Sequence, residues 1–255
     1  MRFDFETHRA HDYLYLVRRW RSLARKAGIR LEPFVTADDF ELLSIRSPAL
    51  EATGGIYFSA GIHGDEAAST EGLYLWAELN AKYLRRLPLL LFPCLNPWGL
   101  VRNRRVDAEG RDLNRSFHLD DVPRIKAHKE LLRGLKFSFA MCLHEDYDAR
   151  GVYLYEVRQT PLRAHRAIGD ELLAAAGYYV PVDLRPKIEG RRANQGAIKR
   201  RIRVKQFPVM PEAAYLALSH SDHTITLETP SEYDLGARVQ AQAAAIQRAV
   251  EIVLG

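Results

Sequence analysis

The chain has 255 residues, of which 47% are hydrophobic and 27% are charged, and its formal net charge is +5 at pH 7. This composition excludes disordered and collagen-like chains, and the length suits one α/β domain over residues 1–255, with 1–50 as an N-terminal extension of it. No apolar stretch reaches the roughly 20 residues that cross a bilayer, and the charged N-terminus lacks the apolar core of a secretory leader. We therefore expect a cytoplasmic protein without a membrane partner, and its oligomeric state stays open.

Apolar periodicity predicts helices and strands that alternate along most of the chain. An amphipathic helix is expected over residues 12–27, and Gly28 ends it. The other expected elements are strands at 55–60, 89–95, 137–143, 152–157 and 224–227, and helices at 66–84, 162–176 and 235–254. This order is typical of an α/β fold with a mixed, mainly parallel sheet and helices on both faces. In such sheets, ligands gather beyond the carboxyl ends of the strands.

Cysteine usage and the distribution of charge bear on the partners of the protein. Cys94 and Cys142 both lie in apolar runs, which predicts two buried free thiols rather than a disulfide. Much of the positive charge lies in residues 185–206. A solvated surface segment is the favoured interpretation, and a nucleic-acid patch or a basic rim that attracts carboxylate substrates are the alternatives. Because no aromatic residues interleave these charges, we expect no nucleic-acid partner.

The first chemical motif is AGIHGDE at residues 60–66, between an expected strand and an expected helix. His63 and Glu66 are three residues apart and can turn toward one point. Imidazole nitrogen and carboxylate oxygen are ordinary zinc ligands, and catalytic zinc sites use three protein ligands and a water. The alternative is a loop histidine beside a glutamate that favours the helix dipole.

Further polar motifs follow later strands. NPWG at 96–99 and RVDAEGRDLNR at 105–115 offer guanidinium and amide groups that suit a planar anion, although a polar surface loop would look the same. His144 ends one expected strand and Glu228 ends another. Taken alone, His144 is typical of a core histidine, and Glu228 of an edge or helix-entry residue.

Together these motifs, in this order, resemble the M14 zinc carboxypeptidase superfamily and its aspartoacylase and succinylglutamate desuccinylase branch. The similarity runs from about residue 56 to 230. It implies that one Zn²⁺ per chain is held by His63, Glu66 and His144, and that Glu228 is the general base. It also implies that Arg105 steadies the oxyanion and that Asn114 and Arg115 grip the substrate's carboxylate. A mobile tyrosine is expected over the substrate, with Tyr215 the first choice and Tyr178, Tyr179 and Tyr233 as alternatives.

The chain departs from the family pattern at a few positions. Asp107 stands where Asn is frequent, and Trp98 where Asp is frequent. Glu145 and Asp146 follow His144, where a small residue is common, and they are expected to support the metal histidines or, less plausibly, to hold a second metal. The polar cluster at 219–223 lies near the strand of the expected base, and we expect an exposed loop there rather than hydrogen bonds to the site.

The expected function is a zinc hydrolase that cleaves an amide or peptide bond beside a free carboxylate, as a metallocarboxypeptidase or peptide amidase. Its partner is a peptide or N-acyl amino acid substrate. An N-acyl amino acid deacylase is the first alternative; we favour the peptidase because the segment after Glu228 reads as a helix rather than as further β-structure. A non-catalytic basic binding protein is the second alternative, and the retained Glu228 argues against it. Side-chain specificity cannot be predicted, since no motif anchors the residues between His144 and Glu228.

Overall fold

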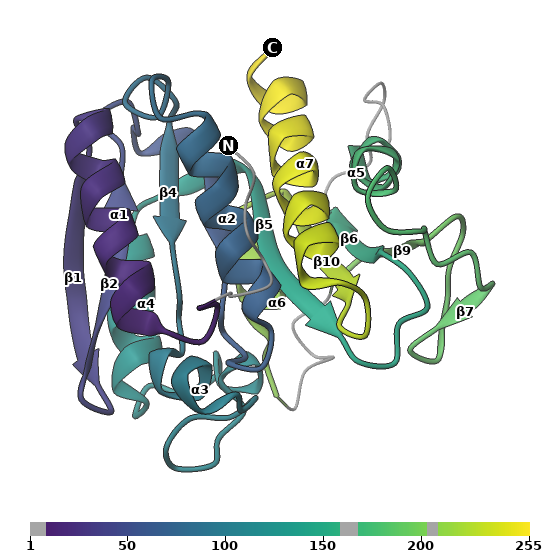
Figure 1. The fold of residues 1–255 in the computed structure, drawn as a ribbon, viewed down its shortest axis with the longest axis horizontal. Coiled ribbons are helices and arrows are strands. Elements are labelled where there is room, and N and C mark those ends of the chain that lie inside the picture. The colour runs from purple at the N-terminus through teal and green to yellow at the C-terminus, as the bar shows by residue number, and fades with distance from the viewer. Residues whose placement is uncertain (1–8, 159–167, 203–208) are drawn as a thin grey trace.

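The computed structural model describes residues 9–158, 168–202 and 209–255 (Figure 1). Its helices are α1 (Tyr13–Ala27), α2 (Ala67–Leu79), α3 (Pro97–Arg102), α4 (Pro123–Leu132), α5 (Ile168–Ala176), α6 (Glu212–Ser219) and α7 (Leu235–Leu254), with a 3₁₀ turn η1 (Leu113–Arg115). Its strands are β1 (Arg30–Ala37), β2 (Phe40–Arg46), β3 (Thr53–Ser59), β4 (Leu89–Phe92), β5 (Lys136–Asp146), β6 (Tyr153–Arg158), β7 (Lys187–Ile188), β8 (Arg191–Arg192), β9 (Ala197–Arg200) and β10 (His223–Pro230).

Eight strands form one sheet in the order β1-β2-β4-β3-β5-β10-β6-β9, and β7 and β8 form a separate hairpin. The four central strands, β4, β3, β5 and β10, are parallel, whereas β1, β2 and β6 run antiparallel to a neighbour and β9 pairs parallel with β6. The predicted mixed, mainly parallel sheet is confirmed. Because the parallel strands all end at one edge, the segments that follow them meet there.

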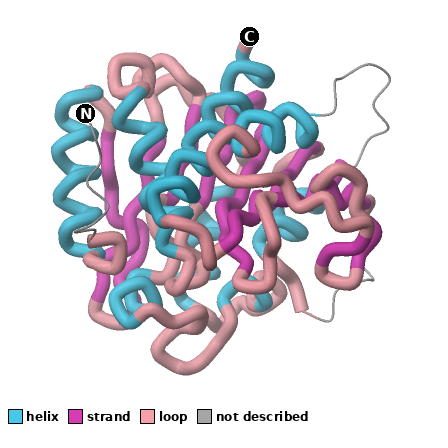
Figure 2. The backbone as a smooth tube through the Cα atoms, turned by 45° about the vertical axis from the view of Figure 1, so that its right-hand side comes forward, coloured by secondary structure: helices cyan, strands magenta, loops and turns pink. Residues whose placement is uncertain are grey.

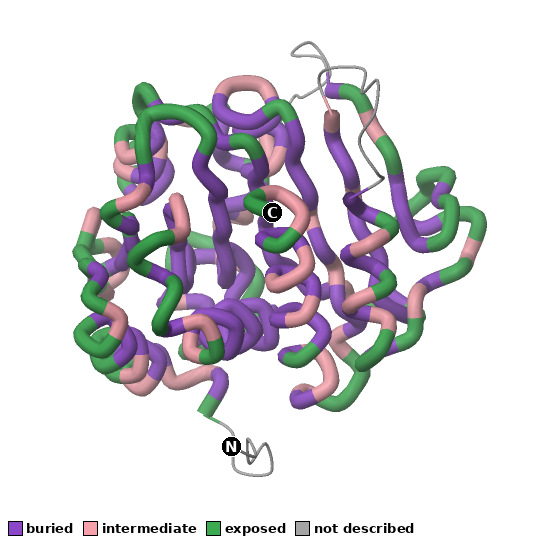
Figure 3. Tube along the Cα trace, turned by 90° about the horizontal axis from the view of Figure 1, so that it is seen from above, coloured by how far each residue is buried: buried purple, intermediate pink, exposed green. Residues whose placement is uncertain are grey.

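Each face of the sheet has its own helices (Figures 1 and 2). Side chains of a strand alternate between the two faces. In β3, Ile56 and Phe58 join a core formed with residues of α1, α2, α5 and α7, whereas Tyr57 joins a core formed with residues of α4 and α6. Helices therefore cover both faces, as predicted. Figure 3 shows the buried residues running along the central strands and the helices packed on them.

Most predicted helices and strands are confirmed, and some boundaries differ. α7 has the predicted bounds, and α1 begins after Asp12, whose side chain caps it, and ends at Gly28 with a φ of 65°. α2 ends at Leu79 rather than at residue 84. The side chain of Asn80 donates a hydrogen bond to the carbonyl of Trp76, and the chain then forms turns. The predicted strand at 89–95 ends at Phe92, because the chain bends at Pro93 toward the next motif.

Other expectations differ in outcome. The β1–β2 pair at one edge of the sheet was not predicted, because the sequence of β1, whose residues are exposed or half-exposed, shows no clean apolar alternation. The first part of the helix expected over 162–176 lies outside the described residues, and α5 begins at Ile168. Cys94 and Cys142 are buried free thiols, as predicted. Among the described residues, no helix is both long and apolar enough to cross a membrane.

Candidate metal and substrate site

Two glycine-containing turns at the carboxyl edge of the sheet set the floor of the site. The HGDE turn follows β3, and the NPWG turn follows β4 and opens α3. A Cβ on Gly64 would lie 1.9 Å from the carbonyl carbon of Gly99, so only glycine allows the two turns to touch. Asn96 caps α3 through Gly99 and also donates to the carbonyl of Val106, which ties the following loop to the same turn.

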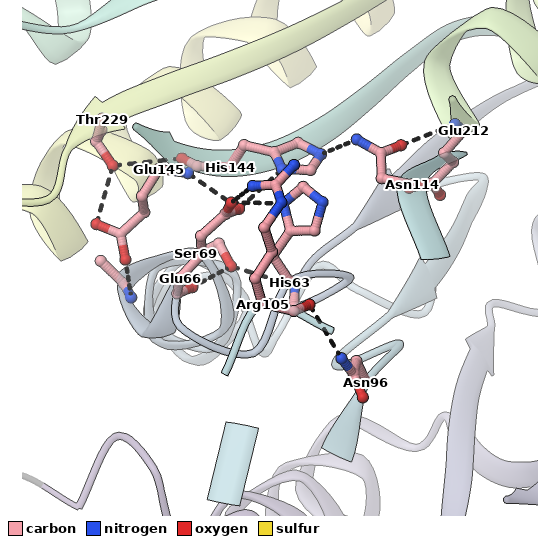
Figure 4. Close-up of polar contacts among 12 residues, drawn as sticks. His63, Glu66, Ser69, Asn96, Arg105, Asn114, His144, Glu145, Glu212 and Thr229 are labelled. Atoms are coloured by element: carbon pink, nitrogen blue, oxygen red, sulfur yellow. Dashed lines mark hydrogen bonds and ion pairs between the residues drawn. The ribbon is translucent and has the colours of Figure 1, made fainter. Parts of the chain in front are cut away.

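Glu66 lies between the two histidines that the sequence singles out (Figure 4). The Nδ1 of His63 is 2.5 Å from Oε1 of Glu66, and the Nδ1 of His144 is 2.8 Å from its Oε2. All three side chains are buried, and their donor atoms lie within 4.8 Å of one another. Glu66 and His144 lie 78 positions apart in the chain, yet the segments that follow β3 and end β5 bring them together.

The donor set fits a catalytic zinc ion. Burial opposes the charge on His63, but Glu66 and the hydrogen bond to Asp112 raise the pKa of the imidazole to about 9. Burial also opposes the charge on Glu66, yet the two histidines hold the pKa of its carboxyl well below its usual range. The cluster therefore attracts positive charge to one point, where a metal cation would take the place of protons on the imidazoles. Two histidines and one glutamate form a known catalytic zinc set.

Glu228 lies beside this cluster because β10 pairs in parallel with β5, so that Glu228 and His144 are register partners. Its side chain lines the cavity and makes no hydrogen bond to a described residue. Burial raises the pKa of the Glu228 carboxyl to about 8; His144 opposes this rise, and the charges of Glu66 and Asp146 add to it. A carboxylate with a raised pKa is a better proton acceptor, as a general base requires.

The cavity in front of these residues has a volume of about 390 Å³, within the range of small-molecule sites. Arg105, Asn114 and Arg115 line it, so the structure brings all of the predicted site residues except Tyr215 to one cavity. Arg105 bonds to Asp112 and lies 3.5 Å from Glu66, while its side chain stays 43% exposed. It can therefore reach a substrate without losing its partner.

The predicted tyrosine is not at the cavity. Tyr215 lies on α6, where its hydroxyl is 3.1 Å from Nε2 of His220 and its ring packs on Phe117. Tyr153 and Tyr155 line the cavity instead, because alternate residues of β6 face it. The alternation of tyrosines in β6 was visible in the sequence, but which face of the strand meets the site was not.

Residues that the sequence reasoning did not place or left open lie around the candidate metal ligands. Asp112 lies 3.2 Å from Nε2 of His63, and Gln242 of α7 donates to the carbonyl of His144 at 2.8 Å. Glu145 accepts from the amide of Ala68 at 2.7 Å and pairs with Arg238 of α7. Asp112 lies within the RDLNR motif, so its place at the site could have been predicted from the sequence, whereas nothing in the sequence links α7 to the site.

The expectation of an exposed loop at 219–223 is wrong. His220, Ser221 and His223 are buried. His223 lies 2.9 Å from Glu156, and His220 lies 2.9 Å from the carbonyl of Leu135. These residues are buried because they connect α6 to β10. Their hydrogen bonds go to Leu135 and Glu156 rather than to the candidate metal ligands.

The basic segment 185–206 is divided between structural and cavity-facing arginines. Arg185 pairs with Asp183, whereas Arg191 and Arg200 line the cavity. Arg191 is exposed and Arg200 is half-buried, so both remain accessible to solvent, and the alternative of a basic rim that attracts carboxylate substrates stays a prediction. Residues 203–206 lie outside the described residues.

Comparisons with known proteins show a family for this chain and solved structures that share its fold. A model of the family described as succinylglutamate desuccinylase/aspartoacylase catalytic domain matches residues 52–253. Mouse carboxypeptidase D is 32% identical over 139 residues, which cover 40% of this chain and 10% of that protein, so the match spans about a tenth of this relative. A Shewanella amazonensis SB2B protein described as a metallopeptidase has the same fold, with a TM-score of 0.83 at 22% identity, over 96% of this chain and 94% of that one. A metallo-carboxypeptidase from Burkholderia cenocepacia shares it with a TM-score of 0.67 at 14% identity, over 93% and 68% of the two chains.

Proposed function

The chain belongs to the succinylglutamate desuccinylase/aspartoacylase family within the M14 superfamily of hydrolases, and from this we propose that it is a zinc-dependent hydrolase of amide bonds beside a free carboxylate. One observation carries the proposal. Two buried imidazoles and a carboxylate converge on one point, and a second carboxylate with a raised pKa, that of Glu228, stands in register beside them.

In this proposal His63, Glu66 and His144 hold one Zn²⁺. When bound, zinc brings the pKa of a coordinated water to about 7. Glu228 takes the proton of the attacking water and delivers it to the departing amine, a role that its position in the cavity supports. Arg105 donates to the oxygen that becomes negative, and a donor of this kind contributes about 10² to 10³ in rate.

Asn114 and Arg115 receive the substrate's carboxylate. The orientation of Asn114 supports this, because its Oδ1 accepts from the amide of Glu212 at 2.9 Å and its Nδ2 is left facing the site, 3.5 Å from Nε2 of His144. The Arg115 side chain bonds only to the carbonyl of Asn114 among the described residues, which leaves the rest of its guanidinium for a ligand.

A peptide and an N-acyl amino acid both meet these requirements. The family match favours deacylation of an N-acyl amino acid as the second candidate, since the matched model is that of the desuccinylase and aspartoacylase catalytic domain. The curated relatives named carboxypeptidase D favour the peptidase. A catalytically silent binding protein would have no use for a general base such as Glu228.

The test is turnover by the purified, zinc-loaded chain. Peptides and N-acyl amino acids are supplied both as free acids and as carboxamides, and released amine is measured with and without a chelator. We expect chelator-sensitive cleavage of the acids, and loss of the preference for acid over carboxamide in Arg115→Met. The class cleaved with the higher kcat/KM decides between peptidase and deacylase. Absence of turnover for every acid would contradict the proposal.

A further inference from the structure

A carboxyl group that the proposed mechanism does not use is buried behind Asn114. It belongs to Glu212, the first residue of α6, whose exposed fraction is 0%. The hydroxyl of Tyr57, in β3, donates to Oε1 of Glu212, and Nε2 of His128 lies 2.8 Å from the same hydroxyl. Burial of an acid costs free energy, so an apolar side chain would fill this space at lower cost. The carboxyl therefore has a role beyond packing.

The main chain of Glu212 acts on Asn114 (Figure 4). The first amides of a helix have no acceptor within the helix, and the side chain of Pro211, the residue before α6, provides no cap. The amide of Glu212 thus needs an acceptor outside the helix, and it donates to Oδ1 of Asn114 at 2.9 Å.

This hydrogen bond decides which end of the Asn114 side chain faces the site. A backbone amide can only donate, so it pairs with the side-chain oxygen and not with the side-chain nitrogen. Nδ2 is thereby turned toward His144 and the cavity that Asn114 lines. In the reverse orientation Oδ1 would face the ligand, where it would repel a carboxylate but accept a hydrogen bond from a carboxamide.

The start of α6 is held from two directions. Just before the helix, Met210 forms a bridge with Ser116, and its carbonyl accepts from the amide of Phe117 at 3.0 Å. In the first turn, Glu212 reaches Tyr57 of β3. The first contact ties α6 to the segment that follows Asn114, and the second ties it to the strand that leads into the HGDE turn.

The side chain of Glu212 therefore links two parts of the candidate site. β3 precedes His63 and Glu66, whereas Asn114 lies in η1 on a separate segment. With its carboxyl bound to β3 and its amide bound to Asn114, Glu212 holds the proposed carboxylate site in a fixed place relative to the metal cluster.

We propose that Glu212 is a positioning residue that sets the preference for a free carboxylate, because its side chain holds the start of α6 on β3 and its amide holds Asn114 with Nδ2 toward the substrate. This inference rests on the proposed function, which assigns Asn114 to the substrate's carboxylate. Glu212 acts through Asn114 and touches no reacting atom.

The experiment measures the preference for acid over carboxamide in two ways. The ligands are the peptides and N-acyl amino acids of the turnover test, each as free acid and as carboxamide. Turnover by the zinc-loaded chain gives kcat and KM. Calorimetry gives the Kd, with Glu228→Gln added to every variant so that no ligand is cleaved.

Glu212→Ala should lower the acid-to-carboxamide ratio of kcat/KM by roughly tenfold, since a hydrogen bond to a charged group is lost. The loss should appear in KM rather than in kcat, because the carboxylate is held alike in the ground state and the transition state. Zinc content should stay at one per chain. Burial raises the pKa of the Glu212 carboxyl, so the uncharged Glu212→Gln, which keeps an oxygen for Tyr57, should retain most of the preference.

Tyr57→Phe removes only the hydroxyl that holds Glu212 and should lower the ratio in the same direction. Tyr13→Phe is the matched control, because it also removes a buried hydroxyl, one that donates to the carbonyl of Glu41 in the other core. It should leave the ratio unchanged. Unfolding temperatures check that each variant folds, and Tyr57→Phe carries the test if Glu212→Ala does not fold.

A double variant separates positioning from a general loss of structure. Asn114→Ala should lower the acid-to-carboxamide ratio by itself, and Glu212→Ala added to it should lower the ratio no further, because Glu212 acts through Asn114. A purely structural defect would instead lower the ratio by the same factor in both backgrounds.

The outcomes for Glu212 and for the hydrolase are distinct. An unchanged ratio in Glu212→Ala, or an equal loss with and without Asn114, would overturn the positioning role even if turnover is robust. Tighter binding of acids that depends on Glu212, without cleavage of any ligand, would support the role and contradict the proposed hydrolase. Equal binding of acid and carboxamide with Glu212 intact would overturn the carboxylate site and the role of Glu212 together.

Discussion

Glu66 is the residue on which the candidate metal site converges. Its two carboxylate oxygens face different histidines, and the amide of Glu145 lies 3.2 Å from Oε2. Fixed ligand orientation of this kind lowers the cost of metal binding, because little side-chain freedom is lost. The consequence is that each imidazole should be essential for the metal rather than one of several interchangeable donors.

Removing either histidine should therefore remove the metal. We expect the wild-type chain to hold one Zn²⁺, and His63→Ala and His144→Ala each to lose it, as measured by elemental analysis after gel filtration. His220→Ala is the control, because it also removes a buried imidazole but bonds to the carbonyl of Leu135 instead of the cluster. Full zinc retention by both site variants would disprove the ligand assignment.

Substitution of Glu228 is expected to lower kcat without the loss of zinc that substitution of a metal ligand would cause. Glu228→Gln keeps the shape of the side chain and removes its basicity, so zinc content should stay at one per chain while kcat falls by at least about 10²-fold. Glu232→Gln, at an exposed position after β10, should leave kcat unchanged. A site variant with near wild-type kcat would move the general base elsewhere in the cavity.

At the scale of elements, α7 supports the site although it contributes no ligand. It packs on α2, where a Cβ on Gly72 would lie 2.4 Å from the Cβ of Gln242, so the two helices approach closely. Nε2 of Gln242 donates to the carbonyl of His144 at 2.8 Å and to Oγ1 of Thr229 at 3.0 Å. The end of β5, and with it one imidazole of the site, is held by a helix from the C-terminal part of the chain.

Gln242→Met should raise the zinc Kd by more than the loss in the free energy of unfolding would explain. Loss of the donor frees the backbone that carries His144, and changes of this kind raise the zinc Kd by roughly 10- to 100-fold. Gln247→Met is the matched control on α7, since Gln247 bonds to Trp76 and Asn80, away from the site. Chelator competition gives the Kd, and denaturant unfolding gives the stability. Equal zinc affinities in the two variants would contradict a positioning role for Gln242.

For the molecule as a whole, stability depends on His128, a histidine in the core that Tyr57 forms with residues of α4 and α6. His128 belongs to α4 and is buried on the side of the helix that faces the sheet. Its ring contacts the rings of Phe34, Phe92 and Phe117. Burial lowers the pKa of its imidazole to about 3, and the charge of His220 adds to this effect. The hydroxyl of Tyr57 lies 2.8 Å from its Nε2, which suits a neutral ring.

The folded chain should therefore lose stability in acid. In the unfolded state, His128 binds a proton below its ordinary pKa of 6.5, whereas in the folded state it does so only near pH 3. Between these two values the free energy of unfolding therefore falls by about 1.4 kcal/mol for each unit that the pH drops. His128→Phe keeps a ring in this core and removes the proton. Between pH 6.5 and pH 5, denaturant unfolding should show a loss smaller by about 2 kcal/mol in the variant than in the wild type. Parallel pH profiles would contradict the assignment.

The fold class, most of the central strands and helices, and the motif residues at strand ends could all be predicted from the sequence. These follow from local patterns: apolar runs, helix periodicity ended by Gly28, and short motifs whose order is typical of one superfamily. The sequence also indicated the donor set of the metal cluster through that resemblance, and the structure brings His63, Glu66 and His144 together.

Which distant residues meet could not be predicted from the sequence and follows from strand pairing and helix packing. The pairing of β10 with β5 places Glu228 beside His144, that of β9 with β6 turns Arg200 toward the cavity, and the packing of α7 brings Gln242 to the site. The tertiary structure also placed Tyr153 and Tyr155 at the cavity, and Tyr215 away from it. The physical reason is that a strand's periodicity shows that it has two faces, whereas its neighbours, and the face that meets the cavity, are set by long-range pairing and packing.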